Sequence, residues 1–218
     1  MEKNKKKTLD MKRLARQITG VIAGVVMMGL AISWLVPCGF GTDGYTALNL
    51  AVSNKLGIMF GTWQALFNII LFIPIIIWGR KMIGFGMFAN MLLVGYVCDF
   101  FSWLWSIVLP QNMFEPMWVR IVIVVPALLC FVFGAAIYMD MDLGASPYDA
   151  LPFIIHERFD KIPFKVLRIS YDLLFVIIGY FFGAPFSAVT LAMAFLLGPV
   201  IEFVGKKLKP LILKENKK

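Results

Sequence analysis

Six polar side chains stand inside the most apolar stretches of this 218-residue chain. An ionisable group inside a membrane-length apolar segment costs about 2.5–3.5 kcal/mol on insertion scales, so each such group needs a reason to be there. A guanidinium in such a place can hold an anionic group, and carboxylates can hold an amine or a coupling proton. We therefore interpret the six residues as candidates for binding a small polar solute. They are Gln64, Asn68, Asp99, Arg168, Asp172 and Glu202.

Four of these residues form two pairs that each span one helical turn. Gln64 and Asn68 are four residues apart, and Arg168 and Asp172 repeat this spacing about 104 residues further along the chain. Side chains at this spacing share a helix face, so Arg168 and Asp172 can form an ion pair. A structural interpretation stays open, because Arg168 can extend to the membrane interface and the amides can join neighbouring helices.

The other two acids, Asp99 and Glu202, are separated by about the same offset of 103 residues. Gly95 and Gly198 stand one turn before them, where the lack of a side chain lets a neighbouring backbone approach closely. We expect Asp99 to lie toward the outer side of a membrane and Glu202 toward the inner side. Glu202 can alternatively be solvated at the inner boundary.

Two further segments belong to the same repeat and open two short helices. Residues 41–48 return as residues 144–151, at the start of predicted helices over 43–56 and 147–159. A helix of this length reaches only about 21 Å, which is too short to cross the roughly 30 Å apolar core of a bilayer. We therefore predict two broken or re-entrant helices.

The residue types at these two starts favour helix capping. Thr42 or Asp43 can cap the first helix. Ser146 can cap the second, with Pro147 in the tolerated first position and Asp149 three residues after the cap. The free amides and partial positive charge of a helix N-terminus suit an anion, so we predict an anionic or zwitterionic solute. The residues that the two starts add to the predicted site are Asp43, Ser146, Tyr148 and Asp149.

The composition indicates that the elements holding these residues cross a membrane. Sixty per cent of the residues are hydrophobic and 16% are charged, against about half hydrophobic in soluble domains. A soluble helical bundle would need polar helix faces, which the apolar segments lack. We predict an all-α membrane protein with six transmembrane helices. The predicted spans are 17–37, 60–79, 84–109, 117–139, 164–183 and 186–205.

Each copy of the repeat holds three predicted spans, and this odd number inverts the second copy relative to the first. All of the 21 Lys and Arg residues except Lys55 and Arg120 then fall on one side, which predicts cytoplasmic termini in a plasma membrane. Basic residues gather at span ends rather than on an aromatic-lined face, so we expect no nucleic acid as a partner. The predicted regions are a basic tail, two inverted three-helix repeats and a second basic tail, at 1–16, 17–109, 117–205 and 206–218.

Short glycine-rich motifs follow one another in both copies: Gly39-Phe40-Gly41, 45–48, Gly57-Ile58, Gly61-Thr62-Trp63, Gly84-Phe85-Gly86, 95–99, 143–151 and 196–199. Over about residues 20–205, the chain resembles the YczE/YitT-like family of bacterial integral membrane proteins. It departs from the family pattern at Gly44-Tyr45 and at 186–190. The resemblance implies a bacterial plasma-membrane protein, and it implies no substrate.

An inverted repeat with broken helices at matching positions is typical of secondary transporters. We therefore predict a transporter that moves a small polar, anionic or zwitterionic metabolite by alternating access. One alternative is the substrate-binding membrane subunit of an ATP-driven importer of the energy-coupling-factor type, which would dock an ATPase through Gly20 and Gly24. Another is a membrane scaffold or accessory protein that has no pocket at the polar residues.

The motifs of several enzyme classes are absent from the sequence. It contains no Walker motif, no His-Glu-x-x-His motif and no Ser/Lys arrangement. Cys38, Cys98 and Cys130 are scattered without metal or disulfide spacing. We therefore expect no enzymatic activity, no cofactor and no metal. The expected partners are the lipid bilayer, a small-molecule substrate, and either further copies of the chain or an ATPase.

Overall fold

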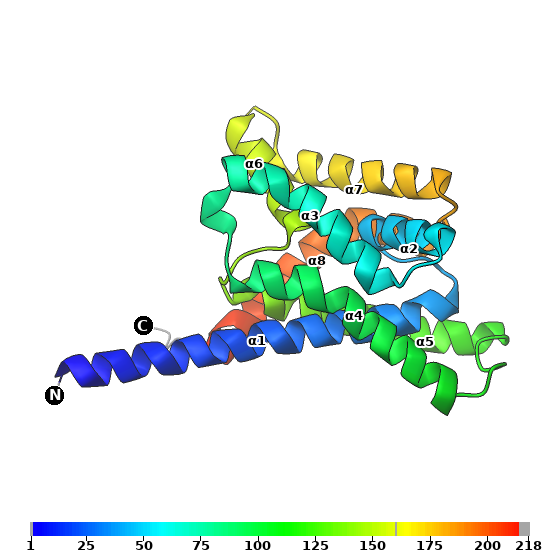
Figure 1. Cartoon of the computed structure of the whole chain (residues 1–218), viewed down its shortest axis with the longest axis horizontal. Helices are drawn as coiled ribbons and strands as arrows, with labels where there is room; N and C mark the ends of the chain where they lie inside the picture. The colour runs from blue at the N-terminus through cyan, green and yellow to red at the C-terminus, as the bar shows by residue number, and fades with distance from the viewer. Residues whose placement is uncertain (1, 160, 214–218) are drawn as a thin grey trace.

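The computed structural model describes residues 2–159 and 161–213, and every regular element in this part of the chain is helical (Figure 1). The predicted all-α fold class is therefore confirmed. Residues 214–218 of the predicted C-terminal tail lie outside the described residues. The elements are α1 (Glu2–Cys38), α2 (Gly44–Leu56), α3 (Phe60–Trp78), the 3-10 turn η1 (Arg80–Met82), α4 (Phe85–Val108), α5 (Met117–Asp140), α6 (Pro147–Arg158), α7 (Phe164–Phe181) and α8 (Ala188–Leu213).

Five of the described helices are long and apolar enough to cross a membrane, which makes the chain a multi-pass membrane protein. They are α1, α3, α4, α5 and α8. The predicted span over 164–183 is helical as α7, but its 18 residues include Lys165, Arg168 and Asp172, so it does not belong to this set by composition. The fifth predicted span is therefore a helix whose apolar length is interrupted by charge.

The described parts of both predicted basic tails, 2–16 and 206–213, are helical and continuous with the spans beside them. α1 begins at Glu2 and has 37 residues, a length of about 55 Å that exceeds the apolar core of a bilayer. Lysine and arginine are good helix formers, and no glycine precedes Gly20 in this segment, so the helix does not end where its apolar part ends. The start of α1 and the end of α8 lie at the same end of the molecule, on the left in Figure 1.

The two short helices form where the sequence predicts them. α2 has 13 residues and α6 has 12. A glycine with positive φ lies two residues before each N-cap, with φ +83° at Gly41 and +102° at Gly144. These backbone turns aim the starts of α2 and α6 into the interior, and a residue with a Cβ would be strained there.

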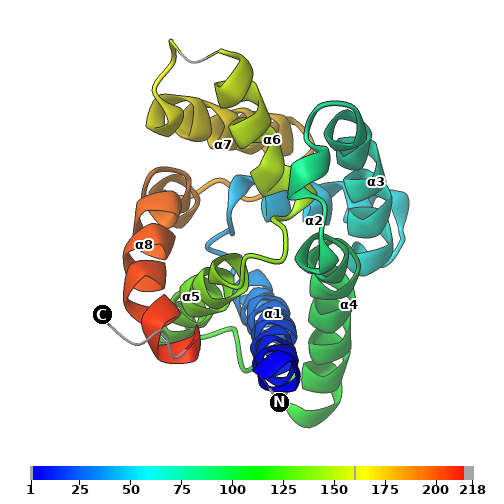
Figure 2. The same cartoon turned by 90° about the vertical axis from the view of Figure 1, so that its left-hand side faces the viewer.

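The helices pack as two groups, and each group takes helices from both parts of the chain. α1 contacts α4 and α5, and α5 contacts α8; we call these four helices the α1 group. α2 and α6 each contact both α3 and α7, and these four form the α2 group. Figure 2 shows α6 and α7 on one side of the molecule and α1, α4 and α5 on the other.

Glycines set the closest approaches within these groups. A Cβ on Gly24 of α1 would lie 2.5 Å from the Gly134 oxygen of α5, and a Cβ on Gly44 of α2 would lie 2.8 Å from the Val176 nitrogen of α7. Gly24 therefore packs within the chain, against α5, rather than facing outward. Gly20 likewise faces the Met141 side chain.

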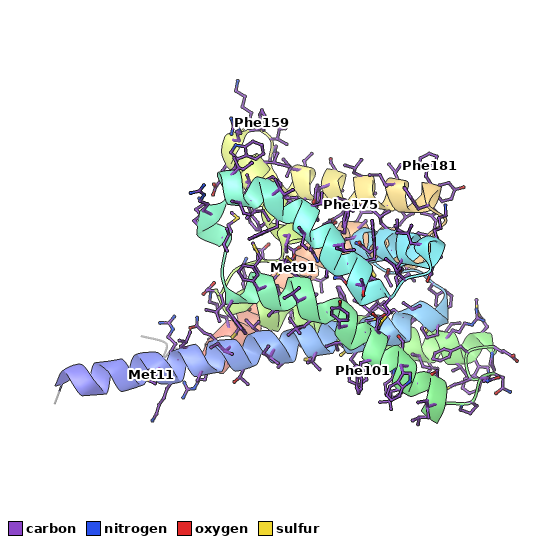
Figure 3. All side chains as sticks on the ribbon, viewed as in Figure 1. Met11, Met91, Phe101, Phe159, Phe175 and Phe181 are labelled. Atoms are coloured by element: carbon purple, nitrogen blue, oxygen red, sulfur yellow. The ribbon has the colours of Figure 1, made fainter. Side chains whose placement is uncertain are left out.

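Large apolar side chains cover the outside of the helices. Phe181 at the end of α7 is 77% exposed, whereas Phe175 on the same helix is 6% exposed and faces α2 (Figure 3). Several isoleucines of α3 are also exposed. Continuous apolar surface of this extent is stable against lipid rather than water.

Candidate functional site

A cavity of about 870 Å³ lies between the two groups of helices. All eight α-helices contribute to its lining, including Met28 of α1, Asn90 of α4 and Phe131 of α5. The starts of both short helices face it. Eight of the ten predicted site residues line the cavity: Asp43, Gln64, Ser146, Tyr148, Asp149, Arg168, Asp172 and Glu202.

Arg168 is the centre of a partly buried charge cluster at the start of α6. Its Nη1 lies 2.9 Å from Asp149 Oδ1, and its Nε lies 3.2 Å from Asp172 Oδ2. The Tyr148 hydroxyl donates to the other Asp172 oxygen. The Arg168 and Asp149 side chains are 18% exposed and that of Asp172 is 10% exposed. The ion pair predicted from spacing is present, and a second carboxylate joins it from α6.

The two short helices are capped by the residues that the sequence singles out. Asp43 accepts a 3.0 Å hydrogen bond from the Thr46 amide at the start of α2. Ser146 accepts a 3.0 Å hydrogen bond from the Asp149 amide at the start of α6, and its hydroxyl donates to Asp149 Oδ2 at 2.6 Å. Each start thus already holds a carboxylate of its own chain.

Aromatic rings join the two starts. The ring centroids of Tyr45 and Tyr148 are 4.5 Å apart, and both rings contact Phe175 of α7. The Arg168 guanidinium lies 5.1 Å from the centroid of the Tyr148 ring. The charged cluster is therefore fixed against a rigid aromatic wall, with cation–π attraction adding to the ion pairs.

Two predicted site residues, Asn68 and Asp99, lie outside the cavity lining. The Asn68 amide donates to the Met91 carbonyl of α4 at 3.4 Å. Asp99 Oδ2 accepts from the Gly61 amide at 2.7 Å, at the start of α3. Both side chains connect α3 to α4, which is the structural role that the sequence left open for the amides.

Glu202 lies at the mouth of the cavity, where its side chain is exposed. Its side chain is 68% exposed, and its Oε1 forms an ion pair with Lys206 Nζ at 2.6 Å. Lys209, another lining residue, pairs with Asp142 at 2.8 Å. The Gln17 amide donates a hydrogen bond to the Met141 carbonyl at 2.7 Å. Because Asp140, the neighbour of Met141, lines the cavity, the mouth lies toward the end of the molecule where α1 begins.

The structure adds lining residues that the sequence reasoning did not select. Tyr45 lines the cavity, and it occupies the same repeat position as Tyr148, so the repeat itself was a signal. Asn90 is an amide inside an apolar span and is 5% exposed. Asp140, the last residue of α5, also lines the cavity.

The two sides of the molecule differ in how closely their helices approach. On the closed side, a Cβ on Gly95 of α4 would lie 2.5 Å from the Gly61 Cα of α3. On the other side, the equivalent residue Gly198 of α8 has nothing within 4 Å of a built Cβ, and it lines the cavity with Lys165 of α7. The cavity therefore opens between α7 and α8 and ends at the α3–α4 contact.

No group of three or more His, Cys, Asp or Glu side chains in the described part of the chain is arranged to hold a metal ion. The site within that part is built from carboxylates, one guanidinium, lysine ammonium groups, amides, hydroxyls and aromatic rings. Such a set binds by hydrogen bonds and charge.

Comparisons with known proteins find one family model and several relatives, one of which is described as a membrane protein. A family model described as "Family of unknown function (DUF6198)" matches residues 15–206. The chain is 26% identical to "Uncharacterized protein YyaS" of Bacillus subtilis, over 82% of this chain and 87% of the relative. It is 22% identical to "Uncharacterized membrane protein YczE" of the same organism, over 88% and 86%. A protein of Haemophilus influenzae is 23% identical over 86% and 83%. No solved structure matches. The resemblance to YczE-like membrane proteins is thereby confirmed.

Proposed function

The chain belongs to the DUF6198 family, and we propose that it is a secondary transporter that carries a small polar metabolite across a bacterial plasma membrane by alternating access. The observation that carries the proposal is the cavity, which is lined by eight of the predicted residues and reaches the gap between α7 and α8. A scaffold protein would need no cavity with a charged cluster on its wall.

An inverted repeat of two three-helix units, with α7 as the sixth crossing, is the architecture we propose. The matched caps, the paired tyrosines and the matched contacts support it, because α2 packs on α7 as α6 packs on α3. Three charges do not prevent α7 from crossing, since Arg168 and Asp172 face the cavity and pair with each other. The basic residues favour a cytoplasmic position for both termini.

Symmetry of this kind supplies the second state of a transport cycle. The present structure has α3 and α4 in contact at Gly61 and Gly95, with the cavity open toward the end where α1 begins and α8 ends. If each repeat adopted the conformation that the other repeat has now, α7 would contact α8 at Gly198 and α3 would separate from α4. The cavity would then open toward the opposite side, as alternating access requires.

One hydrogen bond at the closed side would have to break in the transport cycle, and its repeat equivalent would have to form. Asp99 Oδ2 accepts from the Gly61 amide, so the carboxylate stabilises the partial positive charge at the start of α3. Glu202, its repeat partner, is exposed and pairs only locally with Lys206 in this state. In the opposite state, Glu202 would accept from the start of α7 while Asp99 is released.

The groups that move are the α1 group and the α2 group, rather than one repeat against the other. Each repeat contributes helices to both groups, and the cavity lies between them. The docking surface that an ATP-driven importer subunit would need is not supported, because Gly20 and Gly24 pack against α5 and the residue that follows it.

Distance measurements test this proposal. Spin labels at Met59 and Trp103 report on the closed side, and labels at Pro163 and Lys206, their repeat equivalents, report on the open side; all four positions are exposed. In bilayer nanodiscs we expect two distances for each pair, and conditions that lengthen the first distance should shorten the second. A single unchanging distance in both pairs would contradict a transporter. The labels require replacement of the three native cysteines, Cys38, Cys98 and Cys130.

A further inference from the structure

Starting from the proposed transport function, we infer that one part of the cavity binds the protonated amine of a small organic cation. We call this part, which is lined by Asp43, Asp149 and Asp172, the inner end of the cavity. Three carboxylates, those of Asp43, Asp149 and Asp172, lie at the starts of α2 and α6 and on the facing turn of α7. One cationic side chain, Arg168, lies among them. The inner end therefore carries more negative than positive charge, and a buried excess of one sign is costly unless a ligand balances it.

An anionic ligand would meet carboxylates beside the donors at this place. The Arg168 guanidinium already donates to Asp149 and Asp172. The start of α2 is capped by the Asp43 carboxylate, and that of α6 by the Ser146 hydroxyl with Asp149 beside it. A second anion would lie against these carboxylates, so like-charge repulsion opposes it. The anionic solute expected from the helix starts is thus disfavoured by the caps that form there.

Unused acceptors point to a donor as the ligand. Asp43 Oδ1 and Gln64 Oε1 are buried and have no hydrogen-bond partner among the described residues. Gln64 is 3% exposed, and both residues line the cavity. A protonated amine has up to three N–H donors and no acceptor, which matches a set of unsatisfied oxygens.

Aromatic groups suit the rest of such a ligand. The Tyr45 and Tyr148 rings form one wall beside the carboxylates, and Phe131, Phe153 and Phe164 also line the cavity. Ring faces attract a cation electrostatically and also pack against its hydrocarbon part. The inferred ligand is therefore an amine with a short apolar body.

The inference is tested by binding measurements on the full chain in nanodiscs. Butylamine, 1-butanol and butyrate share one skeleton and differ in charge, and benzylamine, benzyl alcohol and benzoate form a second set. Thermal unfolding is followed at pH 7 with each probe, because a ligand that binds only the folded protein raises Tm. We expect the two amines to raise Tm and the alcohols and carboxylates not to do so.

Asp43→Asn and Glu157→Gln are the matched variants. Each converts an acid to its amide, but Glu157 is an exposed residue that pairs with Lys81 outside the cavity lining. Asp43→Asn should weaken amine binding at least tenfold, and Glu157→Gln should leave it unchanged. If Asp43→Asn does not fold, Gln64→Leu tests the second acceptor and should also weaken binding.

The outcomes separate this inference from the proposed function. Three results would overturn the inference. They are a Tm increase with the carboxylates alone, a Tm increase with the alcohols as large as with the amines, and no Tm increase with any probe. If Asp43 is protonated, the site needs no cation, and no probe would raise Tm. Amine binding together with unchanging distances in both spin-label pairs would retain the binding site and contradict transport.

Discussion

Two glycine substitutions at repeat-equivalent positions should drive the protein in opposite directions. An alanine Cβ at Gly95 would lie 2.5 Å from the Gly61 Cα and 2.8 Å from Gln64 Oε1, so Gly95→Ala cannot form the present α3–α4 contact without a shift of the backbone. The same Cβ at Gly198 meets nothing within 4 Å. Gly198→Ala therefore costs nothing in this state, but it obstructs the α7–α8 contact of the proposed opposite state.

The size of the effect follows from packing energetics. Forcing one extra carbon into a close-packed contact costs about 1–3 kcal/mol, which changes a two-state population about 5- to 150-fold. Gly95→Ala should shift the population by this factor toward a state with α3 and α4 apart. Gly198→Ala should shift it toward the present structure by a similar factor.

The spin-label pairs at Met59/Trp103 and Pro163/Lys206 measure these shifts in nanodiscs. We expect the first distance to lengthen in Gly95→Ala and the second to remain long in Gly198→Ala. Thermal unfolding controls for general damage to the fold. Shifts in the same direction for both variants, or no shift in a Gly95→Ala protein with a normal Tm, would refute the exchange of the two contacts.

Three other changes have expected outcomes. Arg168→Ala leaves the buried carboxylates of Asp149 and Asp172 without their cation, so it should destabilise the protein by about 3–5 kcal/mol, measured as a fall in Tm, while Arg168→Lys should recover part of the loss. Gly144→Ala places a Cβ at φ +102° and 2.8 Å from the Met82 carbonyl, so it should cost about 1–3 kcal/mol by the same assay. Glu202→Gln should leave Tm unchanged because the side chain is exposed, but should shift the Pro163/Lys206 distance toward the open form; a large loss of Tm would contradict this assignment.

The helices and their caps could be predicted from the sequence because their causes are local. The start and end of α3 lie within one residue of the predicted span, and Asp43 and Ser146 cap the short helices as their types suggest. Capping, glycine turns and apolar length all act within a few residues of chain. The start of α1 was not predicted, because the helix extends from the apolar span back to Glu2 and no residue in this segment ends it.

The composition of the site depended on distant contacts that the sequence could not supply. The spacing of Arg168 and Asp172 indicated their ion pair, but Asp149 joins it only because α6 packs beside α7. Asp99 has the residue type of a binding group, yet in this state it caps α3 across the α3–α4 contact. A carboxylate in an apolar span looks the same in sequence whether it holds a ligand or a helix start.

The most direct test of the account is the accessibility of one cysteine from the two sides of a membrane. Gln64 is 3% exposed, lines the cavity and lies against Gly95 at the closed contact. In a variant without the native cysteines, Gln64→Cys should react with a membrane-impermeant maleimide added to either side of oriented vesicles, because the two proposed states expose it in turn. Reaction from one side only, under all conditions and in the Gly95→Ala background as well, would contradict alternating access.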